Sequence, residues 1–368
     1  MKRVHYLILA AFIAVTVSAN AYAQSDVSAE GQGGPNSEVT EAEKIEEAKK
    51  SLEEAAPTRT RLEEIKRGGL LLKKKIIEID TTFTYAHFSE NQLVIDGFAI
   101  LPVLVIGEIN VEKIKQDILI LTETVRYGLT DRVQFEVSVP YRYHYQRFFR
   151  PDVSIGEEEV TNKSNGIGDV SGTLLYHLLN ENAVSPHLVA GLTLKTATGA
   201  SVFNTNPEEG ELPMGTGFYS LRGSLSFVKT ADPAVVFWNI GYTRNFLREG
   251  NVFVAIQDPD TKEISFTEIN TKLEPGDTFE FGFGVAYALS YKLALNTQYQ
   301  QSISLKTKRD GMDVAGTFFN SGAIRIGGAW AWSDESNYHL RSLDLSASFG
   351  VTVDAPDTVV ELRFTHRF

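Results

Sequence analysis

His87 and Ser89 form a pair whose residue types and spacing could carry out nucleophilic chemistry. Residues i and i+2 of a β-strand share a face, so His87 could act as a general base on the Ser89 hydroxyl. A working site also needs a third group that orients the histidine. Glu90 follows the serine, and no separate asparagine lies in a strand suited to that role. We therefore expect that the protein is not an enzyme.

Composition narrows the remaining chemistry. The sequence contains no cysteine, and its seven histidines are scattered. Disulfides, zinc–thiolate sites and a cysteine-linked lipid anchor are therefore excluded, and we expect no metal and no cofactor. The formal net charge is −12. A net negative chain has no surplus of basic side chains to neutralise phosphates and release their counterions, so no nucleic acid is expected as a partner.

The elements that position the remaining polar residues are alternating strands, of which 133–145 is the clearest. Every second position there is apolar or aromatic, and most positions in between are polar. Successive side chains of a strand point to opposite faces. A tilted strand needs roughly nine to eleven residues to cross a bilayer. The segment therefore predicts a transmembrane β-strand with one face toward lipid and the other toward a polar lumen.

Alternation of the same kind extends to the C-terminus. It predicts an all-β fold, a transmembrane β-barrel of about 12 antiparallel strands, because short and long gaps between segments also alternate. The expected strands are 75–89, 112–127, 132–148, 166–179, 185–197, 216–229, 234–247, 277–290, 292–308, 316–332, 338–353 and 357–368. The barrel is assigned to 73–368.

The inward positions of these strands carry charges of both signs. They are Glu136, Arg142, His144, Lys195, Arg222, Glu280, Arg325, Asp344, Glu361 and Arg363. Such a lining could conduct polar solutes or an unfolded chain and hold a polar plug. Alternatively, the charges could pair across the lumen and only stiffen the barrel.

The N-terminal part of the sequence predicts a signal peptide, a flexible linker and a short helix. Residues 1–23 combine Lys2 and Arg3, an apolar run and a small-residue cleavage site, which is typical of a signal peptide. Residues 24–36 are small and polar, as in a flexible linker. Residues 37–72 carry a narrow apolar stripe that predicts a short helix or coiled coil.

An apolar run at 98–109 falls where a loop between strands is expected. It could be an extra strand of the wall, or a loop folded into the barrel mouth as a constriction or an apolar binding site. The candidate residues of this constriction are Phe98, Ile100, Leu101, Pro102 and Leu104.

The last strand ends in Phe368, with apolar residues at alternate positions before it. This ending resembles the C-terminal strand by which the barrel assembly machinery recognises bacterial outer-membrane proteins. His366 departs from that pattern, because an aromatic residue usually stands there.

Three stretches carry a resemblance to a known family: Arg67-Gly68-Gly69-Leu70-Leu71, 97–143, and GIGDVSGTLLYHLL at 166–179. They resemble the outer-membrane family of the meta-pathway of phenol degradation, and within it the secretion channels of functional-amyloid (Fap) systems. The resemblance implies a 12-stranded barrel, a periplasmic coiled-coil trimer and a plug formed just before the first strand. On this chain the plug candidates are Arg61, Leu62, Ile65, Arg67, Leu70 and Leu71.

These observations predict a channel in the bacterial outer membrane, with its N-terminal extension in the periplasm. The specific expectation is a plugged pore that exports unfolded amyloid polypeptide. The alternative is an uptake channel for small hydrophobic or aromatic compounds, and a third possibility is a barrel that conducts nothing. The expected partners are outer-membrane lipid, lipopolysaccharide, the barrel assembly machinery, an unfolded cargo and further copies in a homotrimer.

Overall fold

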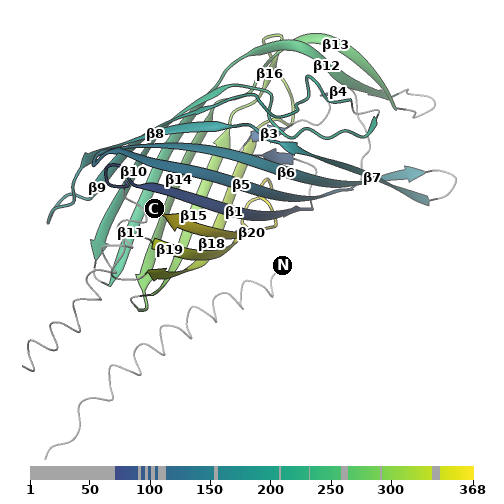
Figure 1. Ribbon diagram of the computed structural model, residues 1–368. Helices are drawn as coiled ribbons and strands as arrows, with labels where there is room; N and C mark the ends of the chain where they lie inside the picture. The colour runs from purple at the N-terminus through teal and green to yellow at the C-terminus, as the bar shows by residue number, and fades with distance from the viewer. Residues whose placement is uncertain are drawn as a thin grey trace, which may run out of the picture. The chain divides into compact units, whose positions relative to one another are not determined.

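Twelve antiparallel strands pair in a closed ring (Figure 1). The computed structural model describes residues 71–89, 93–95, 98–100, 104–106, 113–152, 156–206, 209–231, 233–257, 264–290, 292–333 and 340–368. Around the ring the strands are β1 (Ile77–Phe88), β5 (Lys113–Thr130), β6 (Val133–Asp152), β8 (Ser171–Leu179), β9 (His187–Lys195), β10 (Ser220–Ala231), β11 (Ala234–Asn245), β14 (Thr278–Ala288), β15 (Leu293–Ser304), β18 (Phe319–Ser333), β19 (Leu340–Gly350) and β20 (Thr358–Arg367).

The polarity of the ring is inverted relative to a soluble barrel. Phe283, Leu345 and Leu119 point outward and are 59%, 55% and 52% exposed. Asp80 and Arg142 point inward, and each is only 1% exposed. A surface of large apolar side chains around a charged interior is stable only where lipid takes the place of water outside.

The first and last strands close the ring. β1 pairs with β20 in a register that opposes Glu78 to Arg367 and Thr84 to Glu361. Beyond the last strand, the Phe368 amide donates to the Ile77 carbonyl at 2.8 Å. Since β1 also pairs with β5, no edge of the twelve-stranded ring is open.

The connections define two ends of the barrel. Short turns join β5 to β6, β8 to β9, β10 to β11, β14 to β15 and β18 to β19, and this short-turn end also holds the start of β1. At the opposite, long-loop end, β12 (Arg248–Gln257) and β13 (Ile264–Glu274) pair with β4 (Leu104–Ile106) and β16 (Lys308–Arg309) in a second sheet (Figure 1). The two-residue β17 (Met312–Asp313) completes it.

The wall is interrupted at Gly168–Val170. β7 (Gly156–Ile167) pairs with residues 141–152 of β6, in its long-loop half, and β8 pairs with residues 133–138, in its short-turn half. In the described part of the chain β7 has no strand on its other side, because β9 ends at Lys195 and β10 begins at Ser220. Loop 196–219 runs between those two strands.

The structure confirms all twelve expected strands, since each predicted segment overlaps one strand of the ring. Four strands, β5, β6, β10 and β18, extend beyond the predicted ends. The run at 98–109 adds no strand to the wall in its described parts. β3 (Phe98–Ile100) pairs with β2 (Leu93–Ile95), and β4 pairs in parallel with β12. Leu101, Pro102 and the expected leader, linker and helix up to residue 70 lie outside the described residues. Where the structure describes the chain, no helix is long and apolar enough to cross a membrane.

Candidate functional site

The lumen contains a cavity of about 570 Å³. Its walls come from strands all around the ring, so it is the interior of the barrel rather than a pocket in one wall. Most lining side chains are hydrogen-bonding or charged, including Thr122, Ser138, Thr193, Asn239, Thr243, Gln300, Ser321 and Ser348. Pro140, Ala323 and Val359 add apolar contacts. The cavity can therefore hold a molecule with both an apolar body and polar groups.

Five of the expected lumen residues line this cavity: Lys195, Arg222, Glu280, Arg325 and Glu361. Four of these residues form two ion pairs with each other. Arg222 Nη2 lies 2.5 Å from Glu280 Oε2, and Arg325 Nη2 lies 2.5 Å from Glu361 Oε1. The first pair passes over Gly241, where an added Cβ would lie 3.1 Å from the Glu280 carboxylate. Paired charges leave the lumen close to neutral while keeping it polar.

At the short-turn end, Arg126 gathers three carboxylates. Its guanidinium lies 2.9 Å from Glu78, 2.6 Å from Asp80 and 3.4 Å from Glu136. Arg367 binds the second oxygen of Glu78 at 2.6 Å. Because Arg126 and the carboxylates sit on neighbouring strands of the ring, this network is part of the wall itself. The expected residues Asp344 and Arg363 lie 3.7 Å apart on β19 and β20.

The chain enters the lumen just before β1. The Leu72 side chain is buried, and its amide donates to the inward-facing Gln134 Oε1 at 2.6 Å. A turn at residues 73–76 then leads into β1, with Lys75 at a φ of 68° and its amide bonded to the Gly128 carbonyl. Leu71 is the one plug candidate that the structure describes; Arg61, Leu62, Ile65, Arg67 and Leu70 lie outside the described residues.

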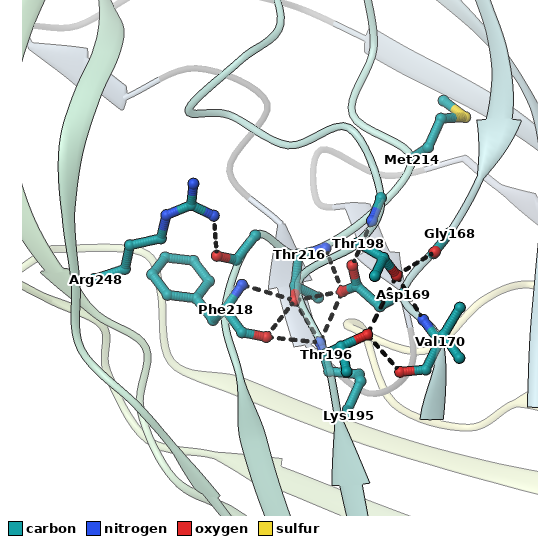
Figure 2. Close-up of polar contacts among 12 residues, drawn as sticks. Gly168, Asp169, Val170, Lys195, Thr196, Thr198, Met214, Thr216, Phe218 and Arg248 are labelled. Carbon is teal, nitrogen blue, oxygen red and sulfur yellow. Dashed lines mark hydrogen bonds and ion pairs between the residues drawn. The ribbon is translucent and has the colours of Figure 1, made fainter. Parts of the chain in front are cut away.

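At the long-loop end, a buried ion pair fastens loop 196–219 to the break in the wall (Figure 2). Asp169 lies between β7 and β8, and its side chain is fully buried. Its Oδ2 accepts hydrogen bonds from Lys195 Nζ at 2.8 Å and from the Thr216 amide at 2.8 Å. Its Oδ1 accepts from the Gly199 amide at 3.1 Å. The Thr216 hydroxyl also lies within hydrogen-bonding distance of both Asp169 and Lys195.

Threonines complete this fastening along the broken strand. The Thr196 amide and hydroxyl both donate to the Val170 carbonyl, at 2.9 and 2.8 Å. The Thr198 hydroxyl donates to the Gly168 carbonyl at 3.1 Å and accepts from the Val170 amide at 2.9 Å (Figure 2). The loop thus satisfies backbone groups that a neighbouring strand would satisfy in an unbroken wall.

The same loop covers two of the expected lumen residues. Arg142 and His144 point inward from β6, and each is 1% exposed. Arg142 Nη1 donates to the Met214 carbonyl at 2.8 Å, and the Leu212 amide donates to Ser164 Oγ on β7 at 2.8 Å. Residues 212–214 therefore lie against the inner surface of β6 and β7, and they occupy the lumen at its long-loop end.

Sequence reasoning missed three groups that matter here: Asp169, Thr216 and Arg126. The Gly166-x-Gly168-Asp169 sequence interrupts the alternation of the expected strand and was the available signal for a break. No pattern marks Thr216, because it reaches Asp169 from 47 residues away. The part that the expected lumen residues play in conduction stays a prediction.

His87 and Ser89 do not form a catalytic pair in the described structure. His87 Nδ1 lies 2.8 Å from Asp117 Oδ1, and the Tyr85 hydroxyl donates to the same oxygen at 2.7 Å. Asp117 is thus a third group that the sequence did not reveal. Ser89 follows the end of β1, and among the described residues no hydrogen bond joins it to His87.

A closed ring with an apolar exterior and a polar lumen is the architecture of an outer-membrane β-barrel. The family model described as "Putative MetA-pathway of phenol degradation" matches residues 99–368, and the chain belongs to this family.

Two solved structures are similar to this chain. An outer membrane channel from Pseudomonas putida F1 is similar with a TM-score of 0.53 and 14% identity, over 81% of this chain and 97% of that chain. The toluene transporter TbuX of Ralstonia pickettii matches with a TM-score of 0.38 and 11% identity, over 80% of this chain and 90% of that one. The similarity to the first of these supports the fold alone, a transmembrane β-barrel.

Proposed function

We propose that the protein is an uptake channel for small aromatic compounds that carry polar groups, with phenols as the reference case. The observation that carries the proposal is the cavity of about 570 Å³, lined by hydroxyl, amide and charged groups beside Pro140, Ala323 and Val359. This volume falls within the roughly 300–1,000 Å³ of small-molecule sites. Membership in a family described by phenol degradation agrees with that chemistry.

Export of unfolded polypeptide, the expectation from the Fap resemblance, is the second candidate. It needs a lumen wide enough for an extended chain, whereas residues 212–214 lie against β6 and β7 inside the ring and narrow it. The entry of the chain into the lumen at Leu72 suits either function, because a segment at that place can serve as a plug. The size of the cavity favours the small solute.

In this proposal the short-turn end faces the periplasm and the long-loop end faces the medium, as in other outer-membrane barrels. Residues 61–72 form the periplasmic plug. Residues 98–109 contribute to the outer mouth, where β4 joins the β12–β13 sheet. Phe368 directs assembly by the barrel assembly machinery, and association in a homotrimer is part of the same proposal.

The test is the initial uptake of labelled phenol, catechol and toluene at micromolar concentration. Cells that lack general porins would be compared with and without the protein. We expect faster uptake of phenol and catechol when the protein is present, and a smaller gain for toluene, which cannot use the polar lining. Asn239→Leu should reduce the gain for catechol, because Asn239 lines the cavity.

The matched control is Ile240→Leu, the neighbouring residue on β11, which is 49% exposed on the lipid-facing surface and should leave uptake unchanged. Equal phenol uptake with and without the protein would contradict the proposal. Transfer of an unfolded polypeptide across liposomes containing the protein, without any aromatic uptake, would favour the export function instead.

A further inference from the structure

A groove runs along the lipid-facing surface of the barrel where β20, β1, β5 and β6 lie side by side. It encloses about 380 Å³, and its lining includes Phe83, Tyr85, Leu119, Tyr141 and Tyr143. The lining is almost wholly apolar, and Leu119 and Phe83 are 52% and 49% exposed. On a surface that faces the membrane interior, such a groove fits a hydrocarbon chain.

The long-loop side of this groove is bordered by cations. The strand register places His87, Asp117, Tyr145 and Lys163 in one outward-facing row across four strands. Tyr85, Leu119 and Tyr143 form the adjacent row toward the short-turn end, and Lys115 with Arg147 forms the adjacent row on the other side. Rows of one face follow each other at two-residue intervals, roughly 7 Å. The cations therefore begin directly where the apolar groove ends.

Two of these cations, Arg147 and Lys163, lie close to one aromatic ring, that of Tyr145. Lys163 Nζ lies 5.3 Å and Arg147 Cζ lies 5.6 Å from the centroid of the Tyr145 ring. Asp117 is the carboxylate nearby, but Tyr85 and His87 already bind its Oδ1 at 2.7 and 2.8 Å. Its contact with Arg147 is long, at 4.0 Å. Among the described side chains, Arg147 and Lys163 thus stand beside this one carboxylate, in a chain whose formal net charge is −12.

An outward cation on another part of the rim is arranged differently. Arg244, at the long-loop end of β11, lies 2.9 Å from Glu274 and 3.0 Å from Asp277. Two carboxylates neutralise that single guanidinium. The cationic patch beside the groove is thus a local feature and does not extend to every outward cation of the rim.

We infer that this surface binds a phosphorylated glycolipid of the outer leaflet, of the lipid A type. Its phosphate lies against Arg147 and Lys163, and one acyl chain lies in the groove beside Leu119. Charge complementarity selects the anionic headgroup, and the apolar groove directly beneath selects a lipid over a free anion. The assignment of the leaflet rests on the proposed orientation of the barrel, but it does not depend on what the lumen transports.

The test is native mass spectrometry of the purified full-length protein with hexa-acylated lipid A. The charge variant is Arg147→Ala with Lys163→Ala, and its matched control is Arg244→Ala. Each surface cation contributes roughly a fivefold factor to the affinity for an anionic lipid, so we expect the charge variant to bind lipid A about 25-fold more weakly. Arg244→Ala should bind as the wild type does.

A second pair of variants probes the groove. Leu119→Trp should fill it and weaken lipid A binding, whereas Leu345→Trp, also on the lipid-facing surface, should not. Heat-modifiable gel migration establishes that each variant is folded. Equal binding by the charge variant and the wild type would overturn the inference. Equal binding of phosphatidylglycerol, or displacement of lipid A by millimolar inorganic phosphate, would also overturn it.

Discussion

The two ends of the barrel are stabilised by different physical means. At the short-turn end, Arg126, Glu78 and Arg367 belong to the strands of the ring, so their ion pairs cannot separate unless the wall deforms. At the long-loop end, residues 212–214 of a loop lie in the lumen, and the loop is held chiefly by the pair between Asp169 and Lys195. Ion pairs within the wall are fixed by strand pairing, whereas a loop can leave the lumen at the cost of a few contacts. We therefore expect the lumen to open at its long-loop end.

Removing one partner of the buried pair should have the largest effect. Asp169→Ala removes the carboxylate that pairs with the buried Lys195, and removing one partner of a buried pair costs roughly 3–5 kcal/mol. The loop should then leave the lumen for much of the time, and the conductance in planar bilayers should rise several-fold. The double variant Asp169→Leu with Lys195→Met restores a neutral contact and should return the conductance toward the wild-type value. An unchanged conductance in Asp169→Ala would show that the loop does not limit the conductance.

The short-turn end should respond less, and through a steric route. A Cβ at Gly128 would lie 2.1 Å from the Lys73 carbonyl oxygen, so Gly128→Val must push the turn at 73–76 away from the wall. We expect a modest rise in conductance and a lower unfolding temperature on heat-modifiable gels. Gly223→Ala is the matched control, since nothing lies within 4 Å of its added Cβ. If both variants behave alike, the contact at Lys73 contributes nothing to closure.

Charges in the cavity between the two ends should alter selectivity rather than closure. Glu280→Gln leaves the positive charge of Arg222 in the lumen, and Arg222→Gln leaves the negative charge of Glu280. We expect the permeability ratio of cations to anions to fall in the first variant and rise in the second, each by about twofold in partly screened surroundings. Reversal potentials in a salt gradient measure this ratio. Shifts of the same sign in both variants would contradict a conducting cavity.

The smallest effect is expected in the turn between β8 and β9. Burial alone would raise the pKa of Glu181, but hydrogen bonds from Thr230 and Lys229 hold this pKa below its ordinary value. Glu181 therefore stabilises the fold above the pKa of the unfolded chain, and this contribution is lost as the pH falls through the lowered folded value. We expect Glu181→Gln to cost under about 1 kcal/mol at pH 7. The difference in unfolding temperature from the wild type should shrink as the pH falls through this lowered pKa.

The ring itself could be predicted from the sequence because the signal is local. Phe279, Phe281 and Phe283 alternate with small or polar residues, and the lipid-facing surface requires this alternation regardless of distant partners. The same alternation correctly predicted that Arg222 and Glu280 face the lumen. Their pairing with each other was not, because β11 separates their strands and only the closed structure brings them together.

The position of the inward loop could not be predicted, because it depends on contacts between residues far apart in the sequence. Loop 196–219 has no periodicity, and its position depends on Asp169, which accepts hydrogen bonds from residues 26 to 47 positions away. The β12–β13 hairpin was likewise read as a loop, because polar residues on both faces of a strand hide its period. Alternation of apolar and polar residues identifies the lipid-facing side of a strand. A strand with no lipid-facing side lacks this alternation, so the sequence does not reveal it.

The pairing of β1 with β20 also fixes the order in which the molecule can be completed. The Thr365 hydroxyl reaches Asp80 across 285 residues of sequence, and closing a loop of that length costs roughly 5 kcal/mol in the simplest chain model. Until β20 is in place, β1 presents an unpaired edge that any other extended chain could occupy. The pairing of β20 with β1 is thus the step that ends this period of vulnerability to aggregation. Folding of this barrel should be slow and should proceed without a stable, partly closed form.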